Sequence, residues 1–386
     1  MRQSAVHRYN EGEDPKSVCM SLGYSKSWLY KWVERFDIKN SEWNQDLPRY
    51  PKNNPQRTSQ EIEKIVKMTR LSLYNRGLFY GAQAILWELE EHRVSPLPSL
   101  RTINRILSRN DLTCKRTGRY EPNGTPYPEF PVKLPNQRHQ ADFVGPRHIR
   151  GIEGAIRFYS LNTVDLATGR CAIEPLLSRS GSAVYEAFWS SWIRLGMPQH
   201  LQVDNELVFR GSPKHPRGMG PLIRLCLSYG IELWFIPPSE PWRNGVVEKF
   251  NDHYQQKFLK MVQMQTEVDL RRESLSFENR HNNRYRYSKL NGKTPLQALA
   301  QMETKQFRNP PKKSAPQTPL NKPESGRLHL IRLIRGNRKL DVFGELFSLA
   351  PEFQYEYVVA TIDVKEQKLR IFHDQAQVDE FEYKLR

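Results

Sequence analysis

The chain has 386 residues and a formal net charge of +17, with 59 lysines and arginines against 42 acidic residues. At about 100–200 residues per domain, this length predicts two to four domains. The mean hydropathy of −0.71 and the lack of any apolar run of about 18 residues exclude a transmembrane span, and the first residues lack the apolar core of a signal peptide. We therefore expect a soluble cytosolic protein without a membrane partner.

The four cysteines lie far apart in the sequence and form no Cys-x-x-Cys pair, which argues against a zinc site or a redox couple. The isoelectric point of about 9.7 favours a polyanionic partner. Nucleic acid is favoured over a membrane surface because no basic amphipathic anchor is evident. On charge alone, a solvated basic surface without such a partner is the alternative.

Residues 1–45 show the pattern of a helix-turn-helix unit. Pro15 suits the first turn of a helix, and Gly23 breaks that helix after Leu22. Ser25 can then cap a second helix whose apolar residues recur at helical spacing, so that its other face is left to solvent, as in a recognition helix. An ordinary small bundle also fits this pattern. The residues expected to face DNA are Lys26, Ser27, Tyr30 and Lys31.

A second helical DNA-binding unit is expected over residues 56–118, after a segment rich in Pro, Asn and Lys that marks a linker. The last helix of this unit, near residues 100–109, has one apolar face and one basic face. Two such units in tandem on a basic chain strengthen the DNA-binding hypothesis. The residues of this unit expected to bind DNA are Arg101, Asn104 and Arg105.

Residues 133–300 show the pattern of a mixed α/β domain, which begins after a proline-rich stretch that excludes regular structure. The segments expected to be strands are 139–144, 155–164, 170–176, 200–203 and 232–236. Helices are expected at 182–195, at 222–229 and from residue 246 onward.

The C-terminal part is expected to hold a linker and a barrel. Residues 301–326 are rich in proline, and the stretch from 305 to 340 carries ten basic residues against one acid. Over half of the net positive charge therefore lies in this stretch. Five short β-runs follow at close spacing, which predicts a small β-barrel over residues 327–386.

Three acidic residues lie at the ends of apolar elements. Asp142 belongs to the first strand of the α/β domain, Asp204 ends the strand at 200–203, and Glu248 lies in the first turn of a helix. Carboxylate oxygens are ligands that Mg²⁺ or Mn²⁺ prefers. Two such ions about 3.5–4 Å apart can activate an attacking hydroxyl and stabilise the leaving oxygen of a phosphodiester. Taken singly, each acid also fits a solvated strand end or helix start.

Other patterns in the chain give weaker signals. The segment from Gly211 to Gly220 lacks the spacing of a phosphate-binding loop and the lysine that directly follows the last glycine of such a loop. His139, His253 and His281 match no zinc template. Asp165 lies in a turn between two strands, where Asp favours local hydrogen bonds to the backbone.

The acids and their surroundings resemble a known catalytic core. The strings that carry the resemblance are Asp142, Asp204-Asn205 and Gly245-Val-Val-Glu248-Lys-Phe-Asn251, supported by Phe235-Ile-Pro-Pro238 and Leu290-Asn-Gly-Lys-Thr-Pro295. Together they resemble the DDE catalytic core of retroviral integrases and bacterial insertion-sequence transposases, over about residues 135–299. The front half resembles the helix-turn-helix pair of such transposases, and the end of the chain resembles the small C-terminal barrel of transposases of the phage Mu type.

The resemblance implies an RNase H-like α/β core between helix-turn-helix units and a small β-barrel. It implies two Mg²⁺ or Mn²⁺ ions held by a catalytic, metal-binding triad of Asp142, Asp204 and Glu248. It also implies that Asn205 and Asn244 are polar neighbours that shape the site.

The chain departs from the family pattern in two places. Glu206 stands where relatives usually have glycine, and Glu248 follows Asp204 by 44 positions, a longer interval than in the retroviral form. Glu206 is therefore weighed as a fourth metal ligand against an exposed or supporting role.

The resulting hypothesis is a DNA transposase that binds the ends of its element, hydrolyses a phosphodiester and transfers the freed 3′-OH to target DNA. Because two ends must be held together, a homo-oligomer on DNA in the bacterial cytosol is expected. The Mu-like end implies an ATPase targeting partner, although no residue identifies one. The alternatives are an RNase H-like nuclease without strand transfer and a catalytically idle, transposase-derived DNA-binding protein.

Overall fold

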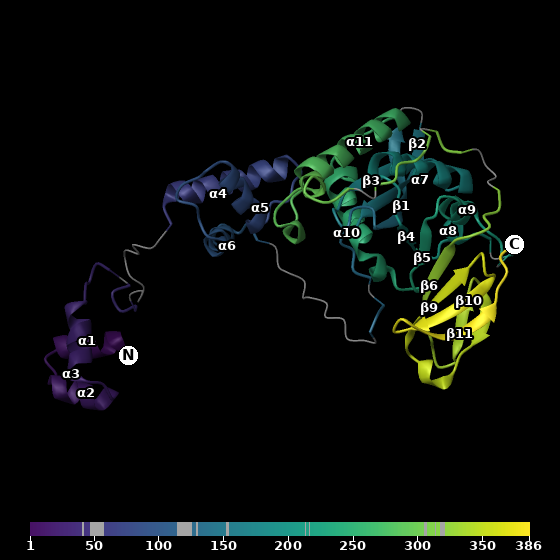
Figure 1. Ribbon diagram of the computed structural model, residues 1–386. Helices are drawn as coiled ribbons and strands as arrows, with labels where there is room; N and C mark the ends of the chain where they lie inside the picture. Colours follow the sequence, from purple (N-terminus) through teal and green to yellow (C-terminus); the bar gives the residue numbers. More distant parts are fainter. Residues whose placement is uncertain are drawn as a thin grey trace. The chain divides into compact units, whose positions relative to one another are not determined.

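The computed structural model describes residues 1–40, 42–46, 58–113, 126–128, 130–151, 154–212, 214–215, 217–304, 307–312, 314–316 and 321–386 (Figure 1). The chain forms two compact units, Met1–Ser59 and Gln60–Arg386. Most of the linker expected between residues 45 and 55, and most of the proline-rich stretch before residue 133, lie outside the described residues. Within the described part of the chain, no helix has the length and apolar character needed to cross a membrane.

The first unit contains the two predicted helices and one more before them. Its helices are α1 (Arg2–Asn10), α2 (Pro15–Leu22) and α3 (Lys26–Glu34). As expected, Gly23 ends α2 with a left-handed φ of 73°, and the Ser25 hydroxyl caps α3 by accepting a hydrogen bond from the third backbone N–H beyond it. The side chains buried between the three helices are Ala5, Val18, Cys19 and Leu29.

The second unit begins with three helices, α4 (Gln60–Asn75), α5 (Ala82–Glu91) and α6 (Leu100–Arg109). Their apolar faces belong to the same buried cluster as residues of the α/β core. The Tyr285 hydroxyl donates a hydrogen bond to the Gly77 carbonyl at 2.6 Å, which ties the turn after α4 to the core. The segment expected as a separate helical unit therefore shares one compact unit with the α/β region.

The core sheet forms as the apolar runs predict. Its first five strands are β1 (Arg138–Gly151), β2 (Gly154–Asp165), β3 (Cys171–Leu176), β4 (His200–Val203) and β5 (Glu232–Phe235). Strands β1, β2 and β3 are antiparallel neighbours, whereas β4 pairs in parallel with both β1 and β5. β1 extends seven residues beyond its expected end at residue 144 because it continues past a register shift to pair with the start of β2.

Helices cover both faces of the sheet. They are α7 (Gly181–Leu195), α8 (Leu207–Arg210), α9 (Pro221–Ser228), α10 (Gly245–Tyr254), α11 (Glu267–Arg284) and α12 (Pro295–Leu299). One buried cluster contains side chains of α7 and α9, and a second contains those of α10 and α11. Because side chains alternate between the faces of a strand, β2 places Leu161 in the first cluster and Phe158 in the second.

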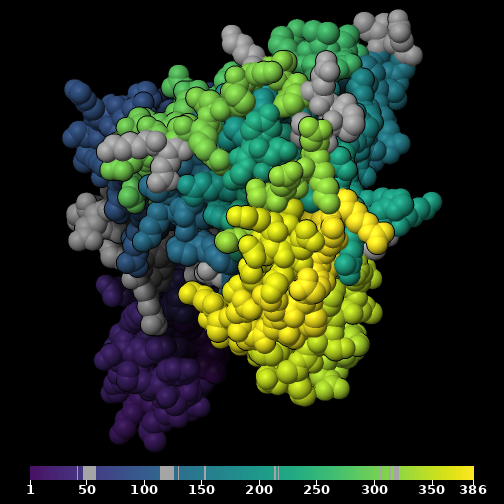
Figure 2. All heavy atoms as spheres, turned by 45° about the vertical axis from the view of Figure 1, so that its right-hand side comes forward, coloured from purple at the N-terminus to yellow at the C-terminus, as the bar shows by residue number. Residues whose placement is uncertain are grey.

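The C-terminal strands do not form the expected separate barrel. They are β6 (Arg327–Leu333), β7 (Lys339–Val342), β8 (Glu345–Ser348), β9 (Tyr357–Asp363), β10 (Lys368–His373) and β11 (Ala376–Glu382). β6 pairs in parallel with β5, so one nine-stranded sheet runs in the order β11-β10-β9-β6-β5-β4-β1-β2-β3, with β7 and β8 as a hairpin beside it. In Figure 2 the yellow-green and yellow spheres of the C-terminal part lie directly beside teal spheres of the core, as the pairing of β5 with β6 requires.

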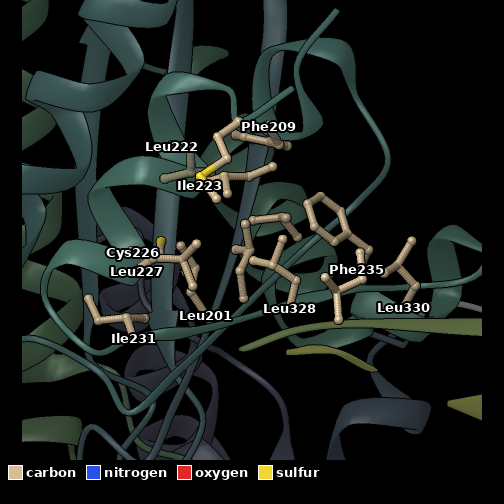
Figure 3. Close-up of a cluster of buried hydrophobic side chains, with 14 of the residues drawn as sticks. Leu201, Phe209, Leu222, Ile223, Cys226, Leu227, Ile231, Phe235, Leu328 and Leu330 are labelled. Atoms are coloured by element: carbon tan, nitrogen blue, oxygen red, sulfur yellow. The ribbon is translucent and has the colours of Figure 1, made fainter. Parts of the chain in front are cut away.

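The physical reason for this arrangement is the shared core. Leu328 and Leu330 on β6 are fully buried in the same cluster as Leu201 and Phe235 (Figure 3). A separate barrel would leave β5 as an open sheet edge, whereas pairing with β6 satisfies that edge and buries both sets of side chains. The described parts of 301–326 also lie on the core, where the Arg308 guanidinium donates to the Pro198 carbonyl at 2.7 Å.

Candidate active site

The sheet brings the two predicted aspartates side by side. β1 and β4 pair in parallel with Gln140 opposite Gln202. Continuing this register by two residues places Asp142 opposite Asp204, just after β4 ends. The sequence alone gives no indication of this alignment, because the two strands are joined through β2, β3 and α7.

The third carboxylate is brought to the same place by α10. Asp142 and Glu248 line one open pocket of about 610 Å³. The buried Gln140 side chain holds the start of α10 against β1, since its Oε1 accepts hydrogen bonds from the backbone N–H groups of Val246 and Val247, each at 3.1 Å. Gln140 was not predicted as a site residue, and only its position two residues before Asp142 could have indicated it.

The electrostatics of the site are those of crowded carboxylates. Burial, the charge of Asp204 and, to a smaller extent, those of Glu248 and Glu206 raise the pKa of Asp142 to about 7. Burial also raises the pKa of Asp204 and of Glu248. A strongly perturbed acid that lines a cleft and has other acids beside it is typical of functional sites. Among the described residues, however, no three acidic, histidine or cysteine side chains form a ready-made metal cluster.

A buried chain of amides, which no sequence pattern predicts, holds Asp142. The Asn251 amide on α10 donates to Asp142 Oδ2 at 2.8 Å and accepts a hydrogen bond from the Asn162 amide at 2.7 Å. Asn162, on β2, in turn accepts one from the Ser160 hydroxyl at 2.8 Å. These three polar side chains are at most 5% exposed, so their hydrogen bonds fix the direction in which the Asn251 amide points.

Both predicted site-shaping asparagines are held by backbone carbonyls. The Asn244 amide donates to the Ala141 carbonyl at 3.1 Å, which links the residue before α10 to the strand that carries Asp142. The Asn205 amide donates to the Ile236 carbonyl at 2.6 Å. Both side chains therefore brace the loops around the carboxylates.

Glu206 lies close to the site but has a partner of its own. Its carboxylate pairs with the Arg179 guanidinium at 2.6 Å, and its backbone N–H donates to Asp204 Oδ1 at 3.0 Å. Burial, followed by the nearby charge of Asp204, raises the pKa of Glu206. The ion pair favours a supporting role over that of a fourth metal ligand.

The remaining candidates fall outside this site. His139 is fully buried beside Asn136 Oδ1 at 2.9 Å, and burial lowers its pKa to about 3. The Asp165 carboxylate accepts hydrogen bonds from the backbone N–H groups of Ala167 and Thr168, as its position in a turn predicts. The predicted DNA-binding residues Lys26, Ser27, Tyr30 and Lys31 are exposed on α3, and Arg101, Asn104 and Arg105 are exposed on α6.

Comparison with known proteins gives a family match over part of this site and structural matches at low sequence identity. Residues 229–295, which include Glu248 and Asn251, match the integrase core domain family. Among solved structures, the HTLV-2 integrase catalytic core domain in complex with magnesium, in its trimeric form, is 20% identical. That match covers 43% of this chain and 97% of the other, with a TM-score of 0.33. The simian T-cell lymphotropic virus intasome in complex with the PP2A regulatory subunit B56 gamma is 14% identical, covers 83% and 97% of the two chains and has a TM-score of 0.35.

Proposed function

We propose that this chain is a metal-dependent DNA transposase of the DDE type. The observation that carries the proposal is a pocket lined by Asp142 on β1 and Glu248 on α10, in which burial and the nearby charge of Asp204 raise the pKa of Asp142 to about 7. The match of residues 229–295 to the integrase core domain supports polynucleotidyl transfer as the reaction class. The magnesium-bound HTLV-2 core domain and the simian virus intasome are the corresponding examples among solved structures.

The chemistry of the carboxylates fits Mg²⁺ or Mn²⁺. Asp142, Asp204 and Glu248 offer hard oxygen donors, and a divalent cation would favour the charged form of Asp142, whose pKa is raised by burial and then by the charges of Asp204 and Glu248. When bound, two such ions supply Lewis-acid activation of the attacking oxygen and stabilisation of the leaving oxygen. The Asn251 amide keeps Asp142 Oδ2 oriented. Lys249 and Arg147 on the pocket lining provide positive charge for phosphate groups.

The described surface also supports DNA as the partner. We propose that the exposed polar and basic side chains of α3 and α6 bind the ends of the element. Target DNA would bind at the carboxylate pocket. A homo-oligomer is proposed because strand transfer joins two ends at one target. An ATPase partner is proposed only from the Mu-type resemblance. The proposed location is the bacterial cytosol, on DNA.

The proposal is tested with DNA that carries the inverted repeats flanking the reading frame. Wild-type protein in Mg²⁺ should cut at the repeat end, and Asp142→Asn, Asp204→Asn and Glu248→Gln should each lower the rate by at least about 10³-fold while still binding the DNA. Asp374→Asn, with an exposed side chain, is the matched control. An Asp142→Asn protein that cuts at the wild-type rate would contradict the catalytic assignment.

A second assay separates the alternatives. A pre-cut end with a free 3′-OH, mixed with target plasmid, should give joined product if the protein is a transposase. Cleavage without any joined product would instead indicate an RNase H-like nuclease. Binding to the repeats with no cleavage in either metal would indicate a catalytically idle DNA-binding protein.

A further inference from the structure

The C-terminal strands contact two loops of the site. One loop carries Asp204, and the other precedes the helix of Glu248. On β6, Arg332 donates from one guanidinium nitrogen to Asn205 Oδ1 at 2.9 Å and from another to the Ile236 carbonyl at 3.2 Å. The Asn205 amide donates to that same carbonyl. Arg332 thus joins the chain just after β4 to the chain just after β5.

The burial of Arg332 makes this contact informative. The residue is only 5% exposed, and burying a guanidinium is unfavourable unless its N–H groups are hydrogen-bonded. Its other acceptors are the backbone carbonyls of Ile331 at 2.9 Å and Asp341 at 3.0 Å. Among the described residues, each acceptor of Arg332 is therefore either within the C-terminal strands or on one of the two loops beside the carboxylates.

A second residue of the C-terminal strands holds the turn before α10. The Tyr357 hydroxyl on β9 lies 2.8 and 2.9 Å from the two carboxylate oxygens of Glu240, and it accepts a hydrogen bond from Arg243 at 3.1 Å. Arg243 also donates to Glu240 at 3.0 Å, and its carbonyl accepts from the Gln202 amide on β4 at 3.0 Å. This turn leads directly into Gly245 and the helix of Glu248.

We propose that Arg332 and Tyr357 are positioning residues for the carboxylate site, so that the C-terminal strands form part of the active site and not a separately acting binding module. The inference rests on the proposed function. Arg332 acts through Asn205 on the loop of Asp204, and Tyr357 acts through Glu240 and Arg243 on the start of α10. A shift of about 1 Å in such a group can cost on the order of 100-fold in rate, so modest loosening of either loop is measurable.

The sharpest test replaces a single hydroxyl in the full-length protein. Tyr357→Phe keeps the ring and removes only the hydrogen bonds to Glu240 and Arg243. Tyr383→Phe is the matched control, because Tyr383 lies in the same C-terminal region and its buried hydroxyl has no hydrogen-bond partner among the described residues. The measurements are single-turnover cleavage of the repeat end in Mg²⁺ at saturating DNA, DNA affinity by anisotropy and the thermal midpoint of unfolding.

We expect Tyr357→Phe to cleave about tenfold more slowly than Tyr383→Phe, with DNA affinity within about twofold and a thermal midpoint close to that of the control. Cleavage equal to that of the control would overturn the inference. Weaker DNA binding at an unchanged cleavage rate would also overturn it, since Tyr357 would then be a DNA contact.

A double variant provides a second, independent test, because it shows whether Tyr357 and Glu240 act on the cleavage rate through the same contact. If Tyr357 acts through Glu240, the double variant Tyr357→Phe with Glu240→Gln should be no slower than the slower single variant. Multiplied losses would overturn the route through Glu240. Arg332→Lys keeps the charge but loses the planar fork, and it should slow cleavage at unchanged DNA affinity, whereas wild-type cleavage by this variant would overturn the role of Arg332.

The wild-type protein separates this inference from the proposed function. If wild-type protein neither cuts nor joins repeat ends in Mg²⁺ or Mn²⁺, the proposed function itself fails. If wild-type protein is active and the Tyr357 and Arg332 variants match it, only the positioning roles fail.

Discussion

Replacement of Asp142 by Asn should stabilise the metal-free protein in a pH-dependent way. In the folded chain the pKa of Asp142 is raised from 3.8 to about 7, mainly by burial and then by the charge of Asp204. A carboxyl whose pKa is higher in the folded state binds more protons there, so the free energy of unfolding falls as pH rises from about 4 to about 7. Each pKa unit corresponds to about 1.4 kcal/mol, which gives a total cost of about 4 kcal/mol above pH 7.

The side-chain amide of the Asp142→Asn variant carries no charge and can still accept the hydrogen bond from Asn251, so this cost disappears in the variant. Between pH 5 and pH 8 the stability advantage of Asp142→Asn over wild type should grow by about 2 to 3 kcal/mol, since about two of the three pKa units of the shift lie in that window. Using the change between two pH values cancels any constant effect of the substitution on packing.

Urea denaturation in EDTA, followed by tryptophan fluorescence, measures this difference in the free energy of unfolding between the variant and wild type. The exposed Asp374→Asn variant serves as the control and should follow wild type at both pH values. Added Mg²⁺ should stabilise wild type at pH 8 and should stabilise Asp142→Asn less, because the variant lacks one of the proposed ligands. An advantage of the same size at pH 5 and pH 8 would refute the reasoning that crowded, buried charge sets the properties of Asp142.

Three further predictions concern neighbouring residues. Asn251→Leu leaves the Asn162 amide without its acceptor, so it should lower the free energy of unfolding by about 1–3 kcal/mol in urea titrations and slow cleavage; unchanged stability would contradict the buried amide chain. Glu206→Gln should alter the Mg²⁺ concentration for half-maximal cleavage less than about threefold, because Glu206 already pairs with an arginine; a tenfold rise would make it a metal ligand. Replacing Arg101 and Arg105 by Ala should weaken binding to repeat DNA and reduce the slope of log affinity against log salt by about two, and an unchanged slope would place the DNA elsewhere.

Local patterns in the sequence predicted most elements well, because local interactions set their ends. The helix expected at 182–195 is α7, with Ser180 as its cap and Gly196 after its last residue. The helix expected from residue 246 onward is α10, which buries Val247, Phe250 and Tyr254 on one side. Spacing and capping are properties of neighbouring residues, so they can be read without the fold.

Elements with weak local signals were missed. Helix α1 buries only Ala5 and Val6 and has no side-chain cap, so its sequence shows no apolar stripe. Strand β7 has only four residues, and its own sequence does not indicate a strand. It is extended because it pairs with β8. Both elements are fixed by packing against neighbours and not by their own propensity.

The sequence by itself determined most of the elements and the placing of Asp142, Asp204 and Glu248 in or directly after three of them, because strand and helix periodicity is local. Only the tertiary structure decided which other residues contact them. The register of β1 with β4 aligns the aspartates, Asn251 reaches Asp142 from another element, and β6 joins the core sheet at β5. A short β-run has the same sequence pattern whether it closes a barrel or extends a sheet, since its hydrogen-bond partner lies far away in the chain.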